Sequence, residues 1–324
     1  MLPIAVDAMG GDRAPSEIVA GAHQAAEAGF PVVLIGPEGL EGAGDLPLIV
    51  ASEVIEMDDD PAKSVRSKRD STLVRAAEAV RDGKASAMIS AGNTGATMAS
   101  ALLRMGRITG VHRPAIATPV PVPGSTPTVL LDAGANAEVQ ADWLVQFAVM
   151  GSVYARKRYG IENPKVGLLS IGEEPGKGDT LRKEAYELLD VAPGINFIGN
   201  VEGRDIMTDT VDVVVTDGFT GNVVLKTLEG TLRGVIRALF DAITQPEYKE
   251  HADALMPALL PMYATFDPEN TGGAILLGID GVCIISHGSS TSRAMVNGIK
   301  VAREMVETDM VGAIREAISA TIHD

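Results

Sequence analysis

The chain has 324 residues, and its 27 Lys and Arg against 43 Asp and Glu give a formal net charge of −16. Hydrophobic residues make up 46 % of the chain and charged residues 22 %, which excludes a disordered or collagen-like protein. The acidic balance argues against non-specific nucleic-acid binding, which requires a basic surface.

The single cysteine and the first residues bear on the compartment of the protein. Cys283 lies in the apolar run 282–285, which predicts a buried thiol, and one cysteine cannot form an internal disulfide. The N-terminus has no basic segment ahead of an apolar one, so we expect no signal peptide. No apolar stretch reaches the roughly 18–20 residues of a membrane span. We therefore expect a cytoplasmic protein.

One unit recurs along the chain: a short apolar run, a turn rich in Gly, Asn, Ser and Thr, and then a helical pattern. The strands are predicted at residues 3–8, 85–90, 127–132, 165–171, 211–216 and 281–286. Apolar strands that alternate with helices predict a doubly wound α/β fold, a mostly parallel sheet with helices on both faces. No linker divides the chain, so residues 1–324 are expected to form a single α/β unit.

The six turns between strand and helix point to a binding site. Ligands of parallel sheets bind beyond the carboxyl ends of the strands, so we expect all six turns at one edge of the sheet. Glycine backbone and free N–H groups at helix N-termini would suit an anion there. The alternative is that these residues serve only as turn and N-cap residues.

Several common catalytic motifs are absent from the sequence. There is no G-x-x-x-x-G-K-[ST] phosphate loop, no G-x-G-x-x-G after the first strand and no G-x-S-x-G elbow. The five histidines show no spacing typical of metal ligands, so no metal and no cofactor are expected.

Three polar residues near predicted turns remain as candidates for chemistry. Lys177 lies in the Gly-rich segment 172–179, Asn222 lies where a turn becomes a helix, and His287 follows an apolar strand. Lys177 would reach an anionic ligand, and Asn222 would donate a hydrogen bond to an oxyanion. His287 would bind a ligand or act as an acid or base. The plainer alternatives are a solvated lysine, an N-cap and a packed histidine.

A series of ordered motifs resembles the PlsX family, the bacterial acyl-acyl-carrier-protein:phosphate acyltransferases. They lie at residues 4–15, 90–96, 112–115, 131–136, 171–178, 197–205, 217–222, 271–274 and 287–290. The resemblance covers the chain almost from end to end. It departs from the family pattern at Pro175 and Asp179, where Glu and Asn are expected.

The resemblance implies a fold and a reaction. The fold would be Rossmann-like and related to the isocitrate and isopropylmalate dehydrogenases and to phosphotransacetylase. A long-chain acyl group would pass from acyl carrier protein to inorganic phosphate, which attacks the thioester directly and gives acyl phosphate for phospholipid synthesis. The family pattern matches Lys177 and Asn222 to the catalytic pair: Lys177 would neutralise phosphate, and Asn222 would polarise the thioester carbonyl. Further candidates for the phosphate and substrate pocket are Gly10, Gly11, Asn93, Thr94, Asn136, His287 and Ser289.

The implied carrier protein is acidic, as this chain is, so its docking needs a local basic patch. The candidates for this patch are Arg66, Lys68 and Arg69, with Arg104, Arg107 and Arg113 as further cations. The alternative is a solvated charged turn.

Residues 223–266 carry two apolar stretches at helical spacing. Leu232, Ile236 and Leu239 belong to the first, and 255–263 forms the second, which Pro257 and Pro261 are expected to break. Core or oligomer interface is the general interpretation of such stripes. The resemblance implies a homodimer and an amphipathic helical hairpin at 230–266 that binds a membrane surface peripherally, with a further contact to the downstream glycerol-3-phosphate acyltransferase.

Three alternatives stay open. A phosphotransacylase that uses acyl-coenzyme A would share the sheet and the phosphate site. A decarboxylating dehydrogenase of related fold is disfavoured because no Asp metal ligands cluster in the sequence. A non-catalytic membrane scaffold of lipid synthesis is disfavoured by Lys177 and Asn222 in Gly-rich turns.

Overall fold

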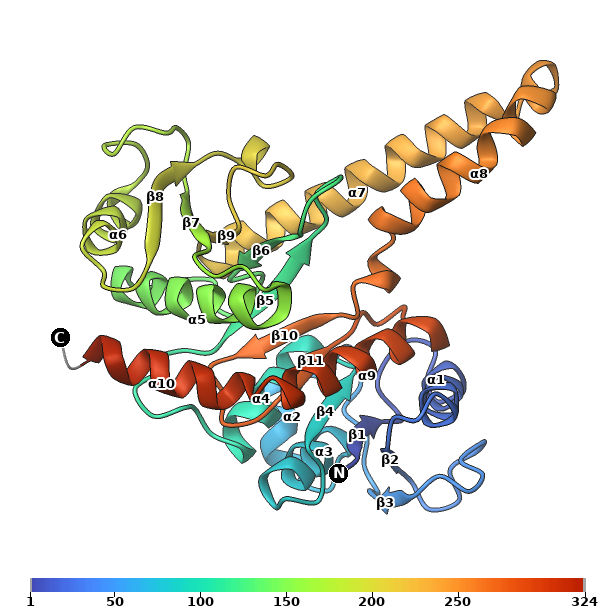
Figure 1. Ribbon diagram of the computed structural model, residues 1–324. Coiled ribbons are helices and arrows are strands. Elements are labelled where there is room, and N and C mark those ends of the chain that lie inside the picture. Colours follow the sequence, from blue (N-terminus) through green and yellow to red (C-terminus); the bar gives the residue numbers. More distant parts are fainter. Residues whose placement is uncertain (1, 323–324) are drawn as a thin grey trace.

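One sheet of eleven strands runs through the whole molecule in the computed structural model, which describes residues 2–322 (Figure 1). The strand order is β3-β2-β1-β4-β11-β10-β5-β6-β9-β7-β8. The strands are β1 (Ile4–Asp7), β2 (Val32–Gly36), β3 (Leu48–Val50), β4 (Ala87–Ser90), β5 (Ala115–Val120), β6 (Thr128–Leu131), β7 (Lys165–Leu169), β8 (Asn196–Val201), β9 (Val213–Val215), β10 (Ala274–Leu277) and β11 (Cys283–Ile285).

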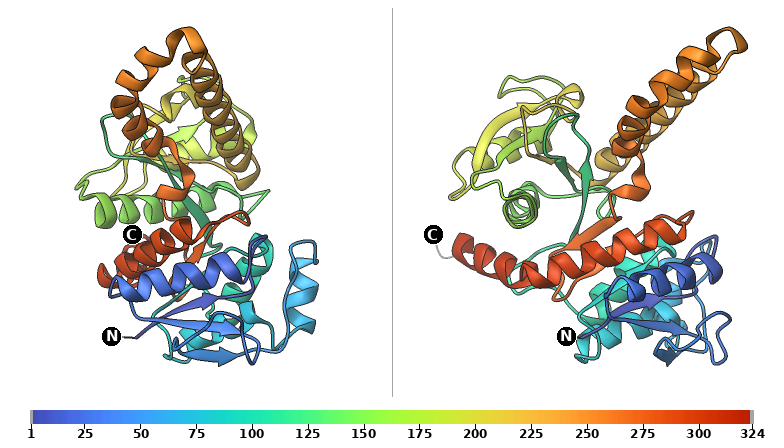
Figure 2. Two further views of the ribbon diagram at one scale, coloured as in Figure 1. Left: turned by 90° about the vertical axis from the view of Figure 1, so that its right-hand side faces the viewer. Right: turned by 45° about the vertical axis from the view of Figure 1, so that its right-hand side comes forward.

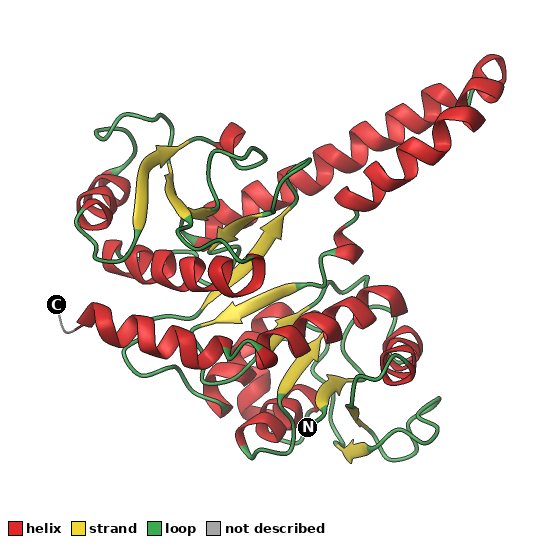
Figure 3. Ribbon diagram, in the orientation of Figure 1, coloured by secondary structure: helices red, strands yellow, loops and turns green. Residues whose placement is uncertain are grey.

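Helices cover both faces of this sheet, as the alternating pattern predicts (Figure 3). The helices α1, α5, α9 and α10 share one hydrophobic core, and α3 and α4 share a second core on the opposite face. The α-helices are α1 (Ser16–Glu27), α2 (Pro61–Ser67), α3 (Thr72–Arg81), α4 (Thr94–Arg104), α5 (Ala141–Tyr159), α6 (Thr180–Asp190), α7 (Gly218–Ile243), α8 (Lys249–Phe266), α9 (Ser292–Glu307) and α10 (Met310–Ile322). Short 3₁₀ helices lie at η1 (Gly203–Asp205), η2 (Pro246–Tyr248) and η3 (Pro268–Asn270).

The centre of the sheet reverses direction, which the sequence pattern did not predict. Strand β10 is antiparallel to both β11 and β5, and β6 is antiparallel to β5, whereas the outer pairings are parallel. The turns after β1, β4 and β11 therefore leave the sheet at the opposite end from the turns after β6, β7 and β9. The prediction that all six turns share one edge is wrong.

The two sets of turns nevertheless meet at the middle of the sheet. Ile275 of β10 lies opposite both Ile284 of β11 and Ala117 of β5. Ala117 in turn lies opposite Leu131, the last residue of β6. The carboxyl ends of β11 and β6 therefore reach the same level from opposite directions, and the turns that follow them flank the central strands.

Helices α7 and α8 form a hairpin that projects from the body of the molecule (Figures 1 and 2). The rings of Phe240 and Tyr263 meet edge to face across it, with centroids 6.3 Å apart. Pro257 and Pro261 lie inside α8, which continues through both, so the predicted break is absent. Within residues 2–322, no helix combines the length and apolar character needed to cross a membrane.

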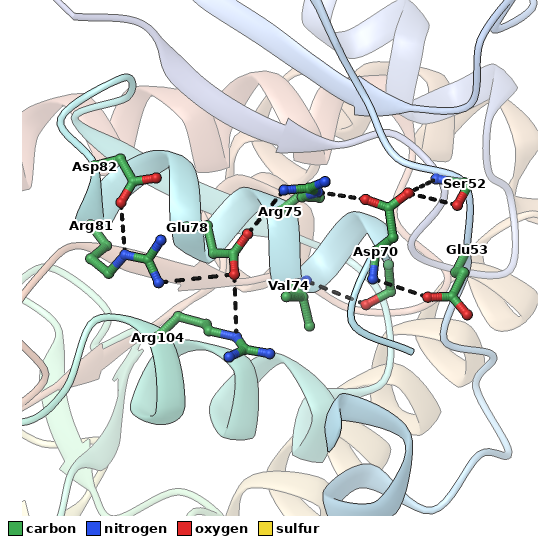
Figure 4. Close-up of polar contacts among 10 residues, drawn as sticks. Ser52, Glu53, Asp70, Val74, Arg75, Glu78, Arg81, Asp82 and Arg104 are labelled. Atoms are coloured by element: carbon green, nitrogen blue, oxygen red, sulfur yellow. Dashed lines mark hydrogen bonds and ion pairs between the residues drawn. The ribbon is translucent and has the colours of Figure 1, made fainter. Parts of the chain in front are cut away.

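An ion-pair network joins α3 to α4 (Figure 4). Glu78 on α3 pairs with Arg75 at 3.3 Å and with Arg104 on α4 at 3.7 Å. Arg75 also pairs with Asp70 at 2.6 Å, and Asp70 accepts hydrogen bonds from Ser52 N and Oγ. The contacts with Ser52 and Arg75 lower the pKa of Asp70 to about 2.

The start of α7 leaves no room for a side chain, because a Cβ on Gly221 would lie 1.9 Å from the carbonyl oxygen of Asp132. We predict that Gly221→Ala lowers the free energy of unfolding by about 2–3 kcal/mol. Gly230 lies in the same helix, and a Cβ added there would meet no atom within 4 Å. Gly230→Ala is therefore the control and should raise the free energy of unfolding by about 0.5–1 kcal/mol. Urea denaturation measures both, and equal stability of the two variants would contradict the close contact.

Asp70 should make stability depend on pH. Since its folded pKa lies below the ordinary value of 3.8, its carboxylate stabilises the fold above about pH 4, and this contribution is lost as the pH falls through 2. Asp70→Asn should therefore cost less than about 1 kcal/mol at neutral pH, since the pair is partly exposed. The urea midpoints of the two proteins should converge as the pH falls from about 4 toward 2, and a gap that does not change with pH would refute the assignment.

Candidate active site

A cavity of about 420 Å³ lies where the two sets of turns meet, between the central strands and the base of the hairpin. Its walls come from the turns after β4, β6 and β11, from β5, and from the sides of α7 and α8 that face the sheet. Gly92, Thr94 and His287 are among the residues that reach it from the first set of turns, and Ala133 and Asn222 reach it from the second. The cavity is therefore the place where both halves of the sheet contribute to one site.

Most of the cavity lining is apolar, and the charged side chains Lys226, Glu229, Arg233 and Arg237 of α7 also reach it. The apolar wall follows α7 and is completed by β5 and the end of α8; its main side chains are Val120, Leu225, Leu228, Leu232, Ile236, Tyr263 and Phe266. Such a surface suits an aliphatic chain, with a few polar groups to fix its reactive end.

A buried carboxylate organises the turn after β6. Asp132 Oδ1 accepts hydrogen bonds from the backbone N–H groups of Ile116, Gly134 and Ala135, at 3.0, 3.1 and 2.9 Å. Its Oδ2 accepts from the backbone and side-chain nitrogens of Asn136 at 2.7 and 2.8 Å. Burial raises the pKa of Asp132, and these donors oppose the rise by stabilising the carboxylate.

This turn positions the first residues of α7. Gly218 N donates to Asn136 O at 2.7 Å, and Asp217 is the N-cap, with its Oδ1 accepting from Thr220 N at 2.8 Å. Asn222 is therefore not the N-cap, which removes its plainer interpretation. It lines the cavity, and Gly134 keeps the space beside it open, since a Cβ there would lie 3.6 Å from that of Asn222.

Three charged or titratable side chains form a cluster at the cavity. His287 Nε2 lies 3.4 Å from Glu229 Oε1, and Lys226 Nζ lies 2.9 Å from Glu229 Oε2. Burial alone would raise the pKa of Glu229, but the contacts with His287 and Lys226 outweigh it and lower the pKa to about 2. Glu229 is therefore an anion at any pH near neutral.

Lys177 lies outside the cavity, in the exposed segment 172–179 after β7. Its backbone N–H donates to Glu174 O at 2.9 Å, and its side chain lies over Gly172. Because β7 pairs with β9, this segment adjoins the start of α7, where Asn222 is. The sequence candidates Lys177 and Asn222 thus lie on neighbouring turns.

Arg182, on the first turn of α6, joins these two turns. It pairs with Asp217, donates to the Oγ1 atoms of Thr216 and Thr220 at 3.2 Å each, and pairs with Asp179 at 3.1 Å. Burial alone would raise the pKa of Asp217. Its hydrogen bonds with Thr220 and Arg182 outweigh burial and leave the pKa below the ordinary value.

Other predicted pocket residues have roles within the fold. Asn93 Oδ1 caps α4 by accepting from Ala96 N at 3.0 Å, and its Nδ2 donates to Met57 O and Asp59 O. Asn136 Nδ2 donates to Pro114 O at 2.8 Å besides Asp132. These amides are engaged, so their place in a phosphate pocket stays a prediction.

The remaining pocket candidates lie in the turns after β1 and β11. Gly10 packs so closely on Asp7 that a Cβ would lie 2.5 Å from Oδ2, and Gly11 has a φ of +108°, which favours glycine. Thr94 lines the cavity, and Ser289 is exposed in the turn after β11.

Most of the predicted docking cations have partners. Lys68 pairs with Asp59 at 2.6 Å, Arg104 with Glu78, and Arg113 lies 5.0 Å from the ring centroid of Trp143. Arg107 donates to His112 O. Arg66 and Arg69 are exposed, and no ion pair involves them in the part of the chain that the structure describes.

Lys226, Glu229 and Arg182 were not among the residues predicted from the sequence. The first two could have been found, because residues 222, 226 and 229 follow i, i+4, i+7 spacing and therefore share one face of a helix with Asn222. The pairing of Glu229 with His287 spans 58 residues and leaves no local pattern. Cys283 is buried, which raises the pKa of its thiol to about 12, so this residue is no nucleophile.

The fold and its central cavity define a class of protein. A branched-chain phosphotransacylase from Enterococcus faecalis has the same fold, with a TM-score of 0.62 at 16 % identity, and covers 94 % of this chain and 99 % of its own. A phosphotransacetylase from Streptococcus pyogenes gives 0.62 at 18 % identity, over 96 % and 94 %. The chain thus has an α/β fold of the phosphotransacylase type, which confirms the predicted fold class.

Sequence comparison gives the family. The family described as "Fatty acid synthesis protein" matches residues 2–312. Proteins named phosphate acyltransferase are similar at 49 % identity in Pelotomaculum thermopropionicum and 48 % in Elusimicrobium minutum, each over 98 % of this chain and 96 % of the relative. The chain belongs to this family and is an enzyme, which confirms the family predicted from the motifs.

Proposed function

We propose that this enzyme transfers a long-chain acyl group from acyl carrier protein to inorganic phosphate and releases acyl phosphate. The observation that carries the proposal is the cavity, which combines an apolar wall on α7 and α8 with polar groups that include Asn222, beside the segment that contains Lys177. An aliphatic chain buried along that wall gains about 25 cal/mol for each Å² of apolar surface removed from water. The thioester at its end then lies at the polar groups.

The proposed reaction has phosphate as the nucleophile. A phosphate oxygen attacks the thioester carbonyl carbon, and the side-chain amide of Asn222 donates to the oxygen that becomes negative. Lys177 neutralises the phosphate from the neighbouring turn. The C–S bond then breaks and acyl phosphate forms. No cofactor takes part in this scheme, and within residues 2–322 no cluster of His, Cys, Asp or Glu fits a metal ion.

The proposed partners come from the family and from the exposed surface. Of the predicted docking cations, Arg66 and Arg69 are exposed and would attract an acidic carrier protein. Val235, Leu255 and Leu260 on the hairpin are each more than half exposed. We propose that the hairpin lies peripherally on a membrane at the cytoplasmic side, that the enzyme is a homodimer, and that the downstream glycerol-3-phosphate acyltransferase receives its product.

The test is an acyl phosphate assay with purified enzyme, inorganic phosphate and either a carrier-protein or a coenzyme A thioester. We expect phosphate-dependent turnover of the carrier-protein thioester, reduced about 10²–10³-fold in kcat by Lys177→Ala and by Asn222→Ala. Lys183, which is exposed on neighbouring α6, provides the control Lys183→Ala and should keep full activity.

The outcomes separate the candidate functions. Preference for the coenzyme A donor would favour the phosphotransacylase alternative, which the shared fold supports. No phosphate-dependent turnover with either donor, in a folded protein, would refute acyl transfer and favour the scaffold.

The cavity predicts which residues set the acyl-chain length. Ile236 lies far along α7 from Asn222, about 21 Å at 1.5 Å per residue, so Ile236→Trp should shorten the space for the chain. We expect turnover of long-chain donors to fall about 10–100-fold and that of short-chain donors to be kept. Val235 is 62 % exposed and next in sequence, so Val235→Trp is the matched control. Equal losses with donors of all lengths would contradict this placement of the chain.

A further inference from the structure

The cluster of His287, Glu229 and Lys226 is not required to hold the turn after β11 in place. The turn that carries His287 is held by other contacts: Ser290 N donates to His287 O at 2.9 Å, and the hydroxyl groups of Ser286 and Ser290 lie 2.8 Å apart. The imidazole itself is not part of this anchoring. It is 49 % exposed and turned toward α7, where its only ion-pair partner among the described residues is Glu229.

In this cluster the carboxylate of Glu229 lies between Lys226 and His287 at the wall of the cavity. Glu229 is only 19 % exposed, and each of its two oxygens has a different partner, Lys226 and His287. Asn222 lies on the same face of α7 two turns earlier. A carboxylate that faces one ring nitrogen of a histidine fixes the orientation of the ring and leaves the other nitrogen, Nδ1, for a substrate.

We propose that His287 is the proton donor to the leaving thiolate and that Glu229, held by Lys226, is the residue that positions it. This inference rests on the proposed function and assigns the step that Asn222 and Lys177 leave unassigned. A cysteine thiol has a pKa near 8.5, and a simple alkyl thiol is less acidic, so a thiolate released near neutral pH takes up a proton. An imidazolium is the side chain suited to supply it, because the ordinary pKa of histidine, about 6.5, is close to the working pH.

The proton transfer accompanies departure of the thiolate. The bond from the phosphate oxygen to the carbonyl carbon has formed, and the C–S bond breaks with its electron pair going to sulfur. The proton moves from Nδ1 of His287 to sulfur, which leaves the free thiol and a neutral imidazole. The overall reaction carries the proton of HPO₄²⁻ to the thiol, so the imidazole regains its proton from the phosphoryl group directly or through solvent.

The charged groups around His287 come from three elements. Glu229 and Lys226 face it from α7. Asp12 approaches the backbone of the same turn, where a Cβ on Gly288 would lie 3.1 Å from its Oδ2, and Asp267 lines the cavity at the end of α8. Asp267 is itself paired with Arg293 at 2.6 Å.

The test compares donors whose thiols differ in acidity. Purified enzyme is given inorganic phosphate with an alkyl thioester or with an aryl thioester of the same acyl chain, because an aryl thiolate leaves without a proton. His287→Gln should lower kcat with the alkyl thioester about 10²–10⁴-fold and with the aryl thioester less than about tenfold. Glu229→Gln should give a smaller loss with the same dependence on the donor. With the alkyl thioester, the rate of the native enzyme should fall on the alkaline side of its pH profile, and this limb should be absent in His287→Gln.

The control is a similar pair of a histidine and a carboxylate that lies outside the cavity. His112 Nδ1 lies 2.9 Å from Asp142 Oδ2 and is about half exposed, so His112→Gln should leave both rates unchanged. Equal losses with the two thioesters in His287→Gln would overturn the proposal, as would a loss confined to a higher KM for phosphate. Absence of acyl phosphate from the native enzyme with either donor would instead refute the proposed function.

Discussion

The carboxylate of Asp132 is the constraint on which the active-site region depends. It is fully buried without a cation beside it, so it is stable only because N–H donors from β5 and from its own turn surround it. The turn shaped in this way receives the N-terminus of α7 through Gly218, and Gly221 packs directly on the backbone of Asp132. The position of Asn222 is thus fixed by a residue that itself does not reach the cavity.

The sequence predicted the elements of the fold well where the local pattern is strong. Short motifs were enough to predict the six units of strand, turn and helix. They also predicted the helices on both faces of the sheet and the family. The reversal at β10, β5 and β6 was missed because strand direction leaves no mark on hydrophobic periodicity, and β10 has only four residues. The break predicted at the two prolines of α8 is wrong. Pro257 and Pro261 each remove one backbone hydrogen-bond donor, yet the helix continues through both.

The candidate site shows the same division between local and long-range information. Lys177, Asn222 and His287 were identified because each follows a strand in a polar turn, and the structure places two of them at one cavity. Asn93 and Asn136 also follow strands in polar turns, but their side-chain amides form hydrogen bonds within a helix cap and a turn. Glu229 was missed because its partner His287 comes from another element, and no spacing along the chain connects them.

The continuous sheet also decides how a substrate enters. Because the strand pairings continue from β3 to β8 without interruption, the two halves of the sheet on either side of β10 cannot separate unless strand pairings break. Of the cavity walls, the one made by Tyr263 and Phe266 belongs to α8, which has no hydrogen bond to any strand among the described residues. Displacement of α8 away from the sheet would therefore widen the cavity without breaking any strand pairing.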